Sequence, residues 1–288
     1  MGSPACIYAL IYAPHERLEA VLLDALAPIA FELRDRPELD SLFFVRFSEP
    51  RWQLRFRVLG EPEWIEGPVR GRLDQRLATL TREGGVESHT FATYDREIER
   101  YGGPAGMKLA ERLFTVDSFA ALELCAADRA GSVRKSRREI AMVLVERLLD
   151  VAGFTHAQKL ALYRHGYQWA LDNGDWTDAE LRVLEARYAA LRPGFERLFS
   201  DDPPLAGAGL WGGETAEAIG ERFLREARPL VEQIRVGLAA GTIRQDPIYL
   251  FWSYAHMFTN RMGIESSAEA VLRFFMHRFH QERQPVPR

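Results

Sequence analysis

Cysteine is scarce in this sequence, with only Cys6 and Cys125 among 288 residues. The two form no CxxC pair and cannot supply the disulfide framework that holds small secreted domains together. We therefore expect two reduced, mostly buried thiols in a cytoplasmic protein. The N-terminus agrees with this location, because it lacks a basic segment followed by a long apolar core and so predicts no signal peptide.

Long apolar runs and an excess of basic charge are also missing. No apolar run reaches the ~20 residues that a membrane-spanning helix needs, so no membrane partner is expected. The net charge is −4, which leaves no global basic excess to neutralise nucleic-acid phosphates, so direct binding of nucleic acid is not expected. GxSxG, Walker and HExxH motifs are absent. His277 and His280 lack an obvious third ligand, so the sequence predicts no metal site.

The first third of the chain alternates between strand and helix patterns. Apolar alternation or short apolar runs predict four strands, at residues 6–13, 42–47, 53–58 and 86–93. Helical spacing predicts two helices, at residues 15–33 and 68–82, with a kink or an end at Pro28. The order β-α-β-β-α-β is that of a ferredoxin-like arrangement. The short link between the second and third strands predicts an antiparallel hairpin.

From about Lys108 the pattern is helical almost throughout. It predicts seven helices, at residues 109–127, 139–152, 156–171, 178–191, 216–239, 249–262 and 268–280. Thr177, with Glu180 three residues on, predicts a helix N-cap, and the Pro- and Gly-rich residues 200–214 predict a loop. We predict a single α+β domain over residues 1–288. Its mainly antiparallel sheet, within residues 1–107, packs with a large helical part within residues 108–288.

A row of polar side chains lies on one face of the third predicted strand. Arg51, Gln53, Arg55 and Arg57 alternate there with apolar residues. A guanidinium is a rigid fork of donors that matches a carboxylate or a phosphate. The row therefore predicts one wall of an anion-binding site. Arg46 alternates out of the preceding apolar strand and is expected on the same side.

A second candidate stretch is YDREIERYGGP at residues 94–104. It places Glu97, Glu99 and Arg100 before two adjacent glycines. Adjacent glycines followed by proline force a tight turn and permit close approach of the backbone to a ligand. Residue types alone favour a solvated, salt-bridged connection between a strand and a helix.

A third candidate stretch is HMFTNR at residues 256–261, within a predicted late helix. His256 and Asn260 are four residues apart and so share a helix face, and Arg261 follows them. The rest of this helix is aromatic and apolar. A lone histidine in such a setting is more often a hydrogen-bonded core residue than a base.

Together the three stretches resemble the C-terminal elimination domain of lantibiotic dehydratases. FFVRFSEPRWQLRFRV, at residues 43–58, resembles that family's FFIRY-DP-HLRLR segment. YDREIERYGGP, followed by AERLFTVDS at residues 110–118, resembles its YEPEIERYGG…AE.IF..DS signature, and HMFTNR resembles its HM..NR motif. The order agrees, and the likeness spans nearly the whole chain. The chain looks like the separate small subunit of thiopeptide-type pathways.

The resemblance implies a lyase that eliminates glutamate. In that family a tRNA-dependent partner esterifies Ser or Thr side chains of a precursor peptide with glutamate. The small domain then eliminates the glutamate and leaves dehydroalanine or dehydrobutyrine. The partners implied are the glutamylated precursor peptide and a separate glutamylation subunit, and no cofactor is implied. A homodimer is compatible with the sequence but not indicated by it.

The resemblance also implies roles for individual residues. His256 would be the acid and base, and Arg57 and Arg100 would act with it in catalysis. Gln53 stands where the family often has His, so it could hydrogen-bond but could not transfer a proton. The residues implied in substrate binding are Arg51, Gln53, Arg55, Glu97, Glu99, Asn260 and Arg261.

Two other functions stay open. Some relatives are pyridine synthases, which join two dehydroalanines in a formal aza-[4+2] cycloaddition and expel the leader peptide. These relatives tend to lose the arginine and histidine set that handles glutamate. The other alternative is a non-catalytic, peptide-binding scaffold with a relict pocket. Convergence of Arg55, Arg57, Arg100 and His256 in one pocket would favour elimination.

Overall fold

The computed structural model describes residues 5–199 and 213–283, so most of the predicted loop at 200–214 lies outside the described residues. All four predicted strands are present and form one sheet: β1 (Ala5–Tyr12), β2 (Leu39–Phe47), β3 (Gln53–Gly60) and β4 (Ser88–Ala92). Their order is β2-β3-β1-β4, and each neighbouring pair is antiparallel. The predicted α+β class is confirmed.

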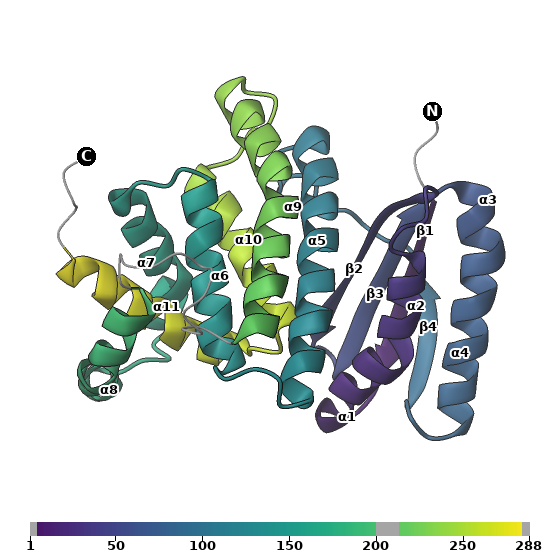
Figure 1. Ribbon diagram of the computed structural model, residues 1–288, viewed down its shortest axis with the longest axis horizontal. Helices are drawn as coiled ribbons and strands as arrows, with labels where there is room; N and C mark the ends of the chain where they lie inside the picture. The colour runs from purple at the N-terminus through teal and green to yellow at the C-terminus, as the bar shows by residue number, and fades with distance from the viewer. Residues whose placement is uncertain (1–4, 200–212, 284–288) are drawn as a thin grey trace.

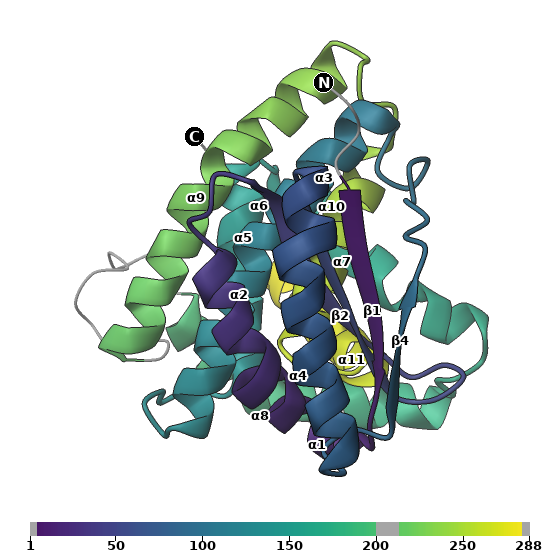
Figure 2. The same ribbon diagram turned by 90° about the vertical axis from the view of Figure 1, so that its right-hand side faces the viewer.

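Two helical segments cover one face of this sheet (Figures 1 and 2). The first consists of α1 (His15–Ala20), the π-helical η1 (Val21–Leu26) and α2 (Ala27–Leu33). The second consists of α3 (Pro62–Trp64), the π-helical η2 (Ile65–Val69) and α4 (Arg70–Arg82). The first helical segment does not end at Pro28 but changes just before it from the π-helical η1 to α2. This proline lies in the first turn of α2, where its missing N–H leaves no essential hydrogen bond unmade.

Alternation along β3 decides which side chains are buried under these helices. Leu54, Phe56 and Val58 are fully buried, and each such side chain contributes about 1.5–3 kcal/mol by leaving water. Arg55 and Arg57 therefore point to the opposite face. Arg46 pairs directly with Leu54, so the register does not put it on their face, although it lines the same cavity as Arg55 and Arg57, described below.

All seven predicted helices of the second part are present, at bounds slightly different from those predicted. They are α5 (Pro104–Arg129), α6 (Arg137–Val151), α7 (His156–Asp172), α8 (Asp178–Leu198), α9 (Glu214–Ala239), α10 (Pro247–Arg261) and α11 (Ser266–Glu282). The predicted N-cap is confirmed, because the Thr177 side chain accepts from the Glu180 N–H in a capping box. Helices α5 and α10 both contact the edge strand β2. The helical part therefore packs beside the sheet on the side away from α2 and α4 (Figure 1).

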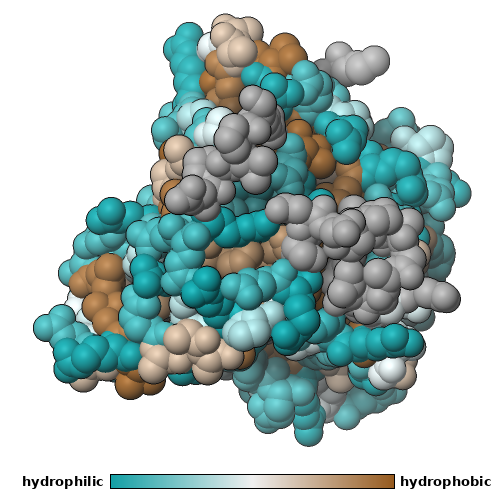
Figure 3. All heavy atoms as spheres, turned by 60° about the vertical axis from the view of Figure 1, so that its left-hand side comes forward, coloured by the Kyte–Doolittle hydropathy of each residue, from teal (hydrophilic) through white to brown (hydrophobic). Residues whose placement is uncertain are grey.

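The described helices include none that is long and apolar enough to span a bilayer. On the face of the molecule shown in Figure 3, hydrophobic side chains form separate patches within a mainly hydrophilic surface. Cys6 and Cys125 are free thiols, and Cys125 is buried.

Candidate functional site

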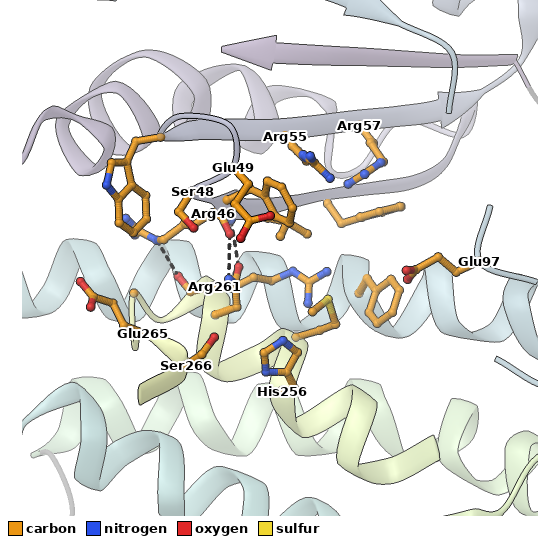
Figure 4. A pocket seen from close by; sticks show the side chains of 18 of the residues that line it. Arg46, Ser48, Glu49, Arg55, Arg57, Glu97, His256, Arg261, Glu265 and Ser266 are labelled. Atoms are coloured by element: carbon orange, nitrogen blue, oxygen red, sulfur yellow. Dashed lines mark hydrogen bonds between the residues drawn. The ribbon is translucent and has the colours of Figure 1, made fainter. Parts of the chain in front are cut away.

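A cavity of about 1040 Å³ lies where the arginine face of the sheet meets α10 and the start of α5. Figure 4 shows Arg55 and Arg57 entering it from the strands and His256 from the opposite side. Seven of the predicted site residues line this cavity: Arg55, Arg57, Glu97, Arg100, His256, Asn260 and Arg261. The three candidate stretches of the sequence therefore meet in one place.

Arg57 lies among aromatic rings and has no acidic partner in the part of the chain that the structure describes. Its guanidinium carbon is 4.2 Å from the ring centre of Tyr8 and 4.8 Å from that of Tyr94. The residue is 9% exposed, and its Nε is buried without a hydrogen-bond partner. A buried cation without a counter-ion is costly, although the ring faces offset part of this cost. The site is therefore suited to an incoming anion.

Arg55 repeats this arrangement one step along β3. Its guanidinium carbon lies 3.4 Å from the ring centre of Phe47, and its buried Nε also lacks a hydrogen-bond partner. Among the described residues, no carboxylate forms an ion pair with Arg55 or Arg57. The two together present adjacent guanidinium groups to the cavity.

Arg100 enters the cavity from the turn before α5. Its Nε donates to Ser253 Oγ at 3.3 Å, and its Nη1 lies 3.3 Å from Glu97 Oε2. Arg100 therefore forms a salt bridge within the connection and also lines the cavity, and its role there stays a prediction. Ser253 fixes the guanidinium from α10, and Glu97 balances part of its charge.

The double glycine serves packing, not approach to the cavity. Gly102 has φ +78°, and a Cβ at this position would lie 2.6 Å from Ile243 Cγ2. Its carbonyl accepts a hydrogen bond from the Arg244 N–H at 2.9 Å. The expected close approach of backbone at this turn is real. The neighbour is the segment between α9 and α10.

His256 is held in a buried chain of charged groups. Its Nδ1 lies 2.6 Å from Glu269 Oε2, and the Arg273 Nη2 donates to the other oxygen of Glu269 at 2.8 Å. Burial opposes the charge of Glu269, but Arg273 and His256 outweigh it and lower the pKa of this carboxyl to about 2. Glu269 is therefore a carboxylate that orients the imidazole. The His256 Nε2 is left without a hydrogen-bond partner in the described residues, as a proton acceptor requires.

Arg261 and Asp117 form a buried pair behind this wall of the cavity. Arg261 is 0% exposed, and its Nη1 lies 3.2 Å from Asp117 Oδ1. Burial raises the pKa of Asp117 to about 7 and lowers the pKa of Arg261. Unlike Arg57, Arg261 therefore has a carboxyl partner within the described residues.

Asn260 joins α10 to the edge of the sheet. Its Oδ1 accepts from the Arg46 N–H at 2.9 Å, and its Nδ2 donates to the Arg46 carbonyl at 2.8 Å. Both halves of the amide are thus used by the backbone of β2. This contact fixes the distance between the strands that carry Arg55 and Arg57 and the helix that carries His256.

Three predicted site residues do not line the cavity. Arg51 precedes β3, so the alternation of the strand does not extend to it, and its guanidinium lies 3.3 Å from Glu87 on the surface. The side chain of Gln53 is buried and donates from Nε2 to the Glu49 carbonyl at 2.8 Å. Glu99 is exposed, outside the lining of the cavity.

Sequence reasoning gave no role to Glu269 or Asp117. Glu269 lies in the first turn of α11, and its partner His256 lies on a different helix, α10. Asp117 was visible only as part of a motif. The described residues contain no group of three or more His, Cys, Asp or Glu side chains that could hold a metal ion.

The family can be assigned from the whole chain. A family model described as the C-terminal part of lantibiotic biosynthesis dehydratases matches residues 7–280. The chain belongs to this family. Among curated relatives of this lantibiotic dehydratase C-terminal family, the subtilin biosynthesis protein SpaB of Bacillus subtilis is 27% identical over 154 residues. That match covers 54% of this chain and 15% of SpaB, so the chain spans only a small part of that relative.

Solved structures show the same fold. The tRNA-dependent lantibiotic dehydratase MibB from Microbispora sp. 107891 matches with a TM-score of 0.66 and 22% identity, over 96% of this chain and 28% of MibB. The pyridine synthase TbtD from thiomuracin biosynthesis matches with a TM-score of 0.69 and 14% identity, over 96% of this chain and 98% of TbtD. At these identities the likeness concerns the fold alone.

Proposed function

We propose that this member of the lantibiotic dehydratase C-terminal family is a lyase that eliminates glutamate from glutamylated Ser or Thr residues of a precursor peptide. The observation that carries the proposal is the pairing of two functions across one cavity. Within residues 5–199 and 213–283, Arg55 and Arg57 are cations without a carboxylate partner, and His256 is oriented by Glu269 while its Nε2 has no hydrogen-bond partner. An elimination that expels a carboxylate needs both an anion site and a base.

The base acts on the α-proton of the modified residue. His256 Nε2 takes this proton, and the electron pair of the Cα–H bond forms the Cα=Cβ double bond. Peptide α-protons are very weakly acidic, so the developing enolate oxygen needs a cation or a hydrogen-bond donor at hand. Arg100 is suited to this task, because Ser253 and Glu97 fix its guanidinium at the cavity wall. The charge of the Glu269 carboxylate stabilises the imidazolium that forms.

The leaving group departs as the α-carboxylate of glutamate when the Cβ–O bond breaks. Arg57 and Arg55 receive the negative charge in charge-assisted hydrogen bonds, which are stronger than neutral ones. Glu97 is placed to contact the ammonium group of the glutamate. Arg261 and Asn260 position these groups, through Asp117 and through the backbone of Arg46. The proton on His256 then passes to water and the site is reset.

The partners of this reaction follow from its substrate. A separate subunit that uses glutamyl-tRNA would supply the glutamylated precursor peptide, in keeping with the tRNA-dependent dehydratase among the structural matches. The reaction needs no redox step, so the proposal requires no cofactor.

One assay tests the proposal. The purified chain is incubated with a precursor peptide that carries glutamyl esters on Ser or Thr, and the peptide mass is followed with time. The expected result is loss of one glutamic acid for each modified residue, and a His256→Ala variant should be inactive. A product that has lost the leader peptide and carries a six-membered nitrogen ring would identify a pyridine synthase instead. Tight binding without any mass change would identify a scaffold.

A further inference from the structure

A second, smaller cavity of about 560 Å³ adjoins the candidate site. It shares Arg100, His256 and Ser266 with the first cavity and continues from them between α7 and α10. The side chains that are new to it are mainly planar rings: His165 and Trp169 of α7, and Tyr249 and Trp252 of α10. We call these four residues the ring groove.

The rings form a continuous series that begins at the proposed base. Trp252 lies nearly parallel to His256, with ring centres 5.6 Å apart and an angle of 11° between the planes. His165 meets Trp252 edge to face at 4.8 Å, and Tyr249 lies 5.9 Å from His165. Trp169 is 37% exposed although it is large and apolar. An exposed tryptophan at the edge of such a groove marks a contact surface.

Three of the polar side chains in the groove are already paired. Gln168 Nε2 donates to Asp172 Oδ1 at 2.9 Å, and Glu269 is held by His256 and Arg273. The four ring residues offer a ligand the faces and edges of their rings. Rings of this kind bind other planar rings better than they bind aliphatic groups of similar size.

We propose that the ring groove binds the stretch of peptide next to the modified residue and prefers a side chain with a planar aromatic ring there. This inference rests on the proposed function, because a peptide whose modified residue lies at His256 must leave the cavity through an adjoining opening. An extended chain advances ~3.3–3.6 Å per residue. The ring steps of 5.6 and 4.8 Å from His256 to His165 thus place the aromatic side chain within about three residues of the modified one.

The test uses glutamylated peptides that differ at a single position. Phe, Leu or Ala is placed in turn at each of about four positions on either side of the modified Ser. Binding is measured by fluorescence anisotropy, and elimination by mass loss in single turnover. At one position Phe should bind roughly 3- to 10-fold more tightly than Leu, which is apolar but has no ring.

Variants locate the preference. Trp169→Leu and His165→Ala should each reduce the ratio of Phe to Leu binding toward one. Phe31→Ala is the matched control, because Phe31 is 38% exposed on α2 and lies outside both cavities. The proposed role of the ring groove would be overturned if the ratio of Phe to Leu binding were unchanged in Trp169→Leu and His165→Ala. It would also be overturned if no position of the peptide showed a preference for a ring. Binding with a ring preference but no mass loss would instead overturn the proposed reaction.

Discussion

Arg57 and Arg261 are both buried guanidiniums, but their surroundings are opposite. Arg261 has Asp117 at 3.2 Å, whereas Arg57 has only ring faces and no described carboxylate. Removing one partner of a buried ion pair leaves an uncompensated charge, which typically costs about 3–5 kcal/mol. Removing a buried charge that has no partner carries no such cost. Arg57 is therefore suited to binding an anion and not to stabilising the fold.

This contrast predicts different outcomes for the same substitution at the two positions. Arg261→Met should lower the free energy of unfolding by about 3–5 kcal/mol. Arg57→Met should leave it unchanged within about 1 kcal/mol, or raise it, because the aromatic setting accepts an apolar side chain. Arg57→Met should nevertheless reduce elimination by about 100-fold or more. Urea unfolding and the mass-loss assay measure the two effects. Equal destabilisation by both substitutions would mean that Arg57 is structural.

Glu269 links stability to pH in a direction that can be measured. Its pKa is about 2 in the folded protein against 4.5 for the ordinary carboxyl. Between these values the unfolded chain binds a proton that the folded chain does not, so the stability from Glu269 is present above pH 4.5 and is lost as pH falls toward 2. Glu269→Gln should be less stable than the parent at neutral pH. The difference in their free energies of unfolding should decrease as pH falls from 4.5 toward 2. Chemical unfolding of the parent and of Glu269→Gln across this pH range measures the difference.

At the scale of elements, the sequence predicted the four strands and the long helices, but not α3 and not how the helices meet. Alternation placed Arg55 and Arg57 on one strand face, and helical spacing placed His256 and Asn260 on one helix face. Both follow from periodicity within a single element. The contact between His256 and Glu269 joins α10 to α11, and no periodicity reports a contact between two helices.

Alternation within one strand could not place Arg51 and Arg46 correctly. Arg51 was counted with the row, but the ladder begins at Gln53, so the side chain before it is free to turn toward Glu87. Arg46 was placed with the row because it interrupts an apolar run. Arg46 does line the same cavity, but its register opposite Leu54 means that it does not project from the same strand face. Register depends on a partner strand that a single strand does not specify.

At the scale of the whole molecule, the site exists only where the two parts of the chain meet. Arg57 comes from the sheet and His256 from the helical part. The contacts that bind the two parts are distributed along their boundary. The Leu42 N–H donates to Thr115 Oγ1 at 3.0 Å, Arg34 contacts Glu123, and Arg137 Nη2 donates to Glu19 Oε1 at 2.8 Å.

These contacts predict that the protein unfolds as one unit. Phe56 is fully buried between the sheet and the helices that cover it, and it lies far from α7 and α11 in sequence. Phe56→Ala should lower the free energy of unfolding by about 3–5 kcal/mol. Hydrogen exchange of the slowest amides gives their opening free energy. If residues 1–107 and 108–288 form one domain, Phe56→Ala should lower this free energy by the same amount in α7 and α11 as in β1 and β3. Faster exchange confined to the sheet would show two domains, and the cavity would then be an interface that can open between them.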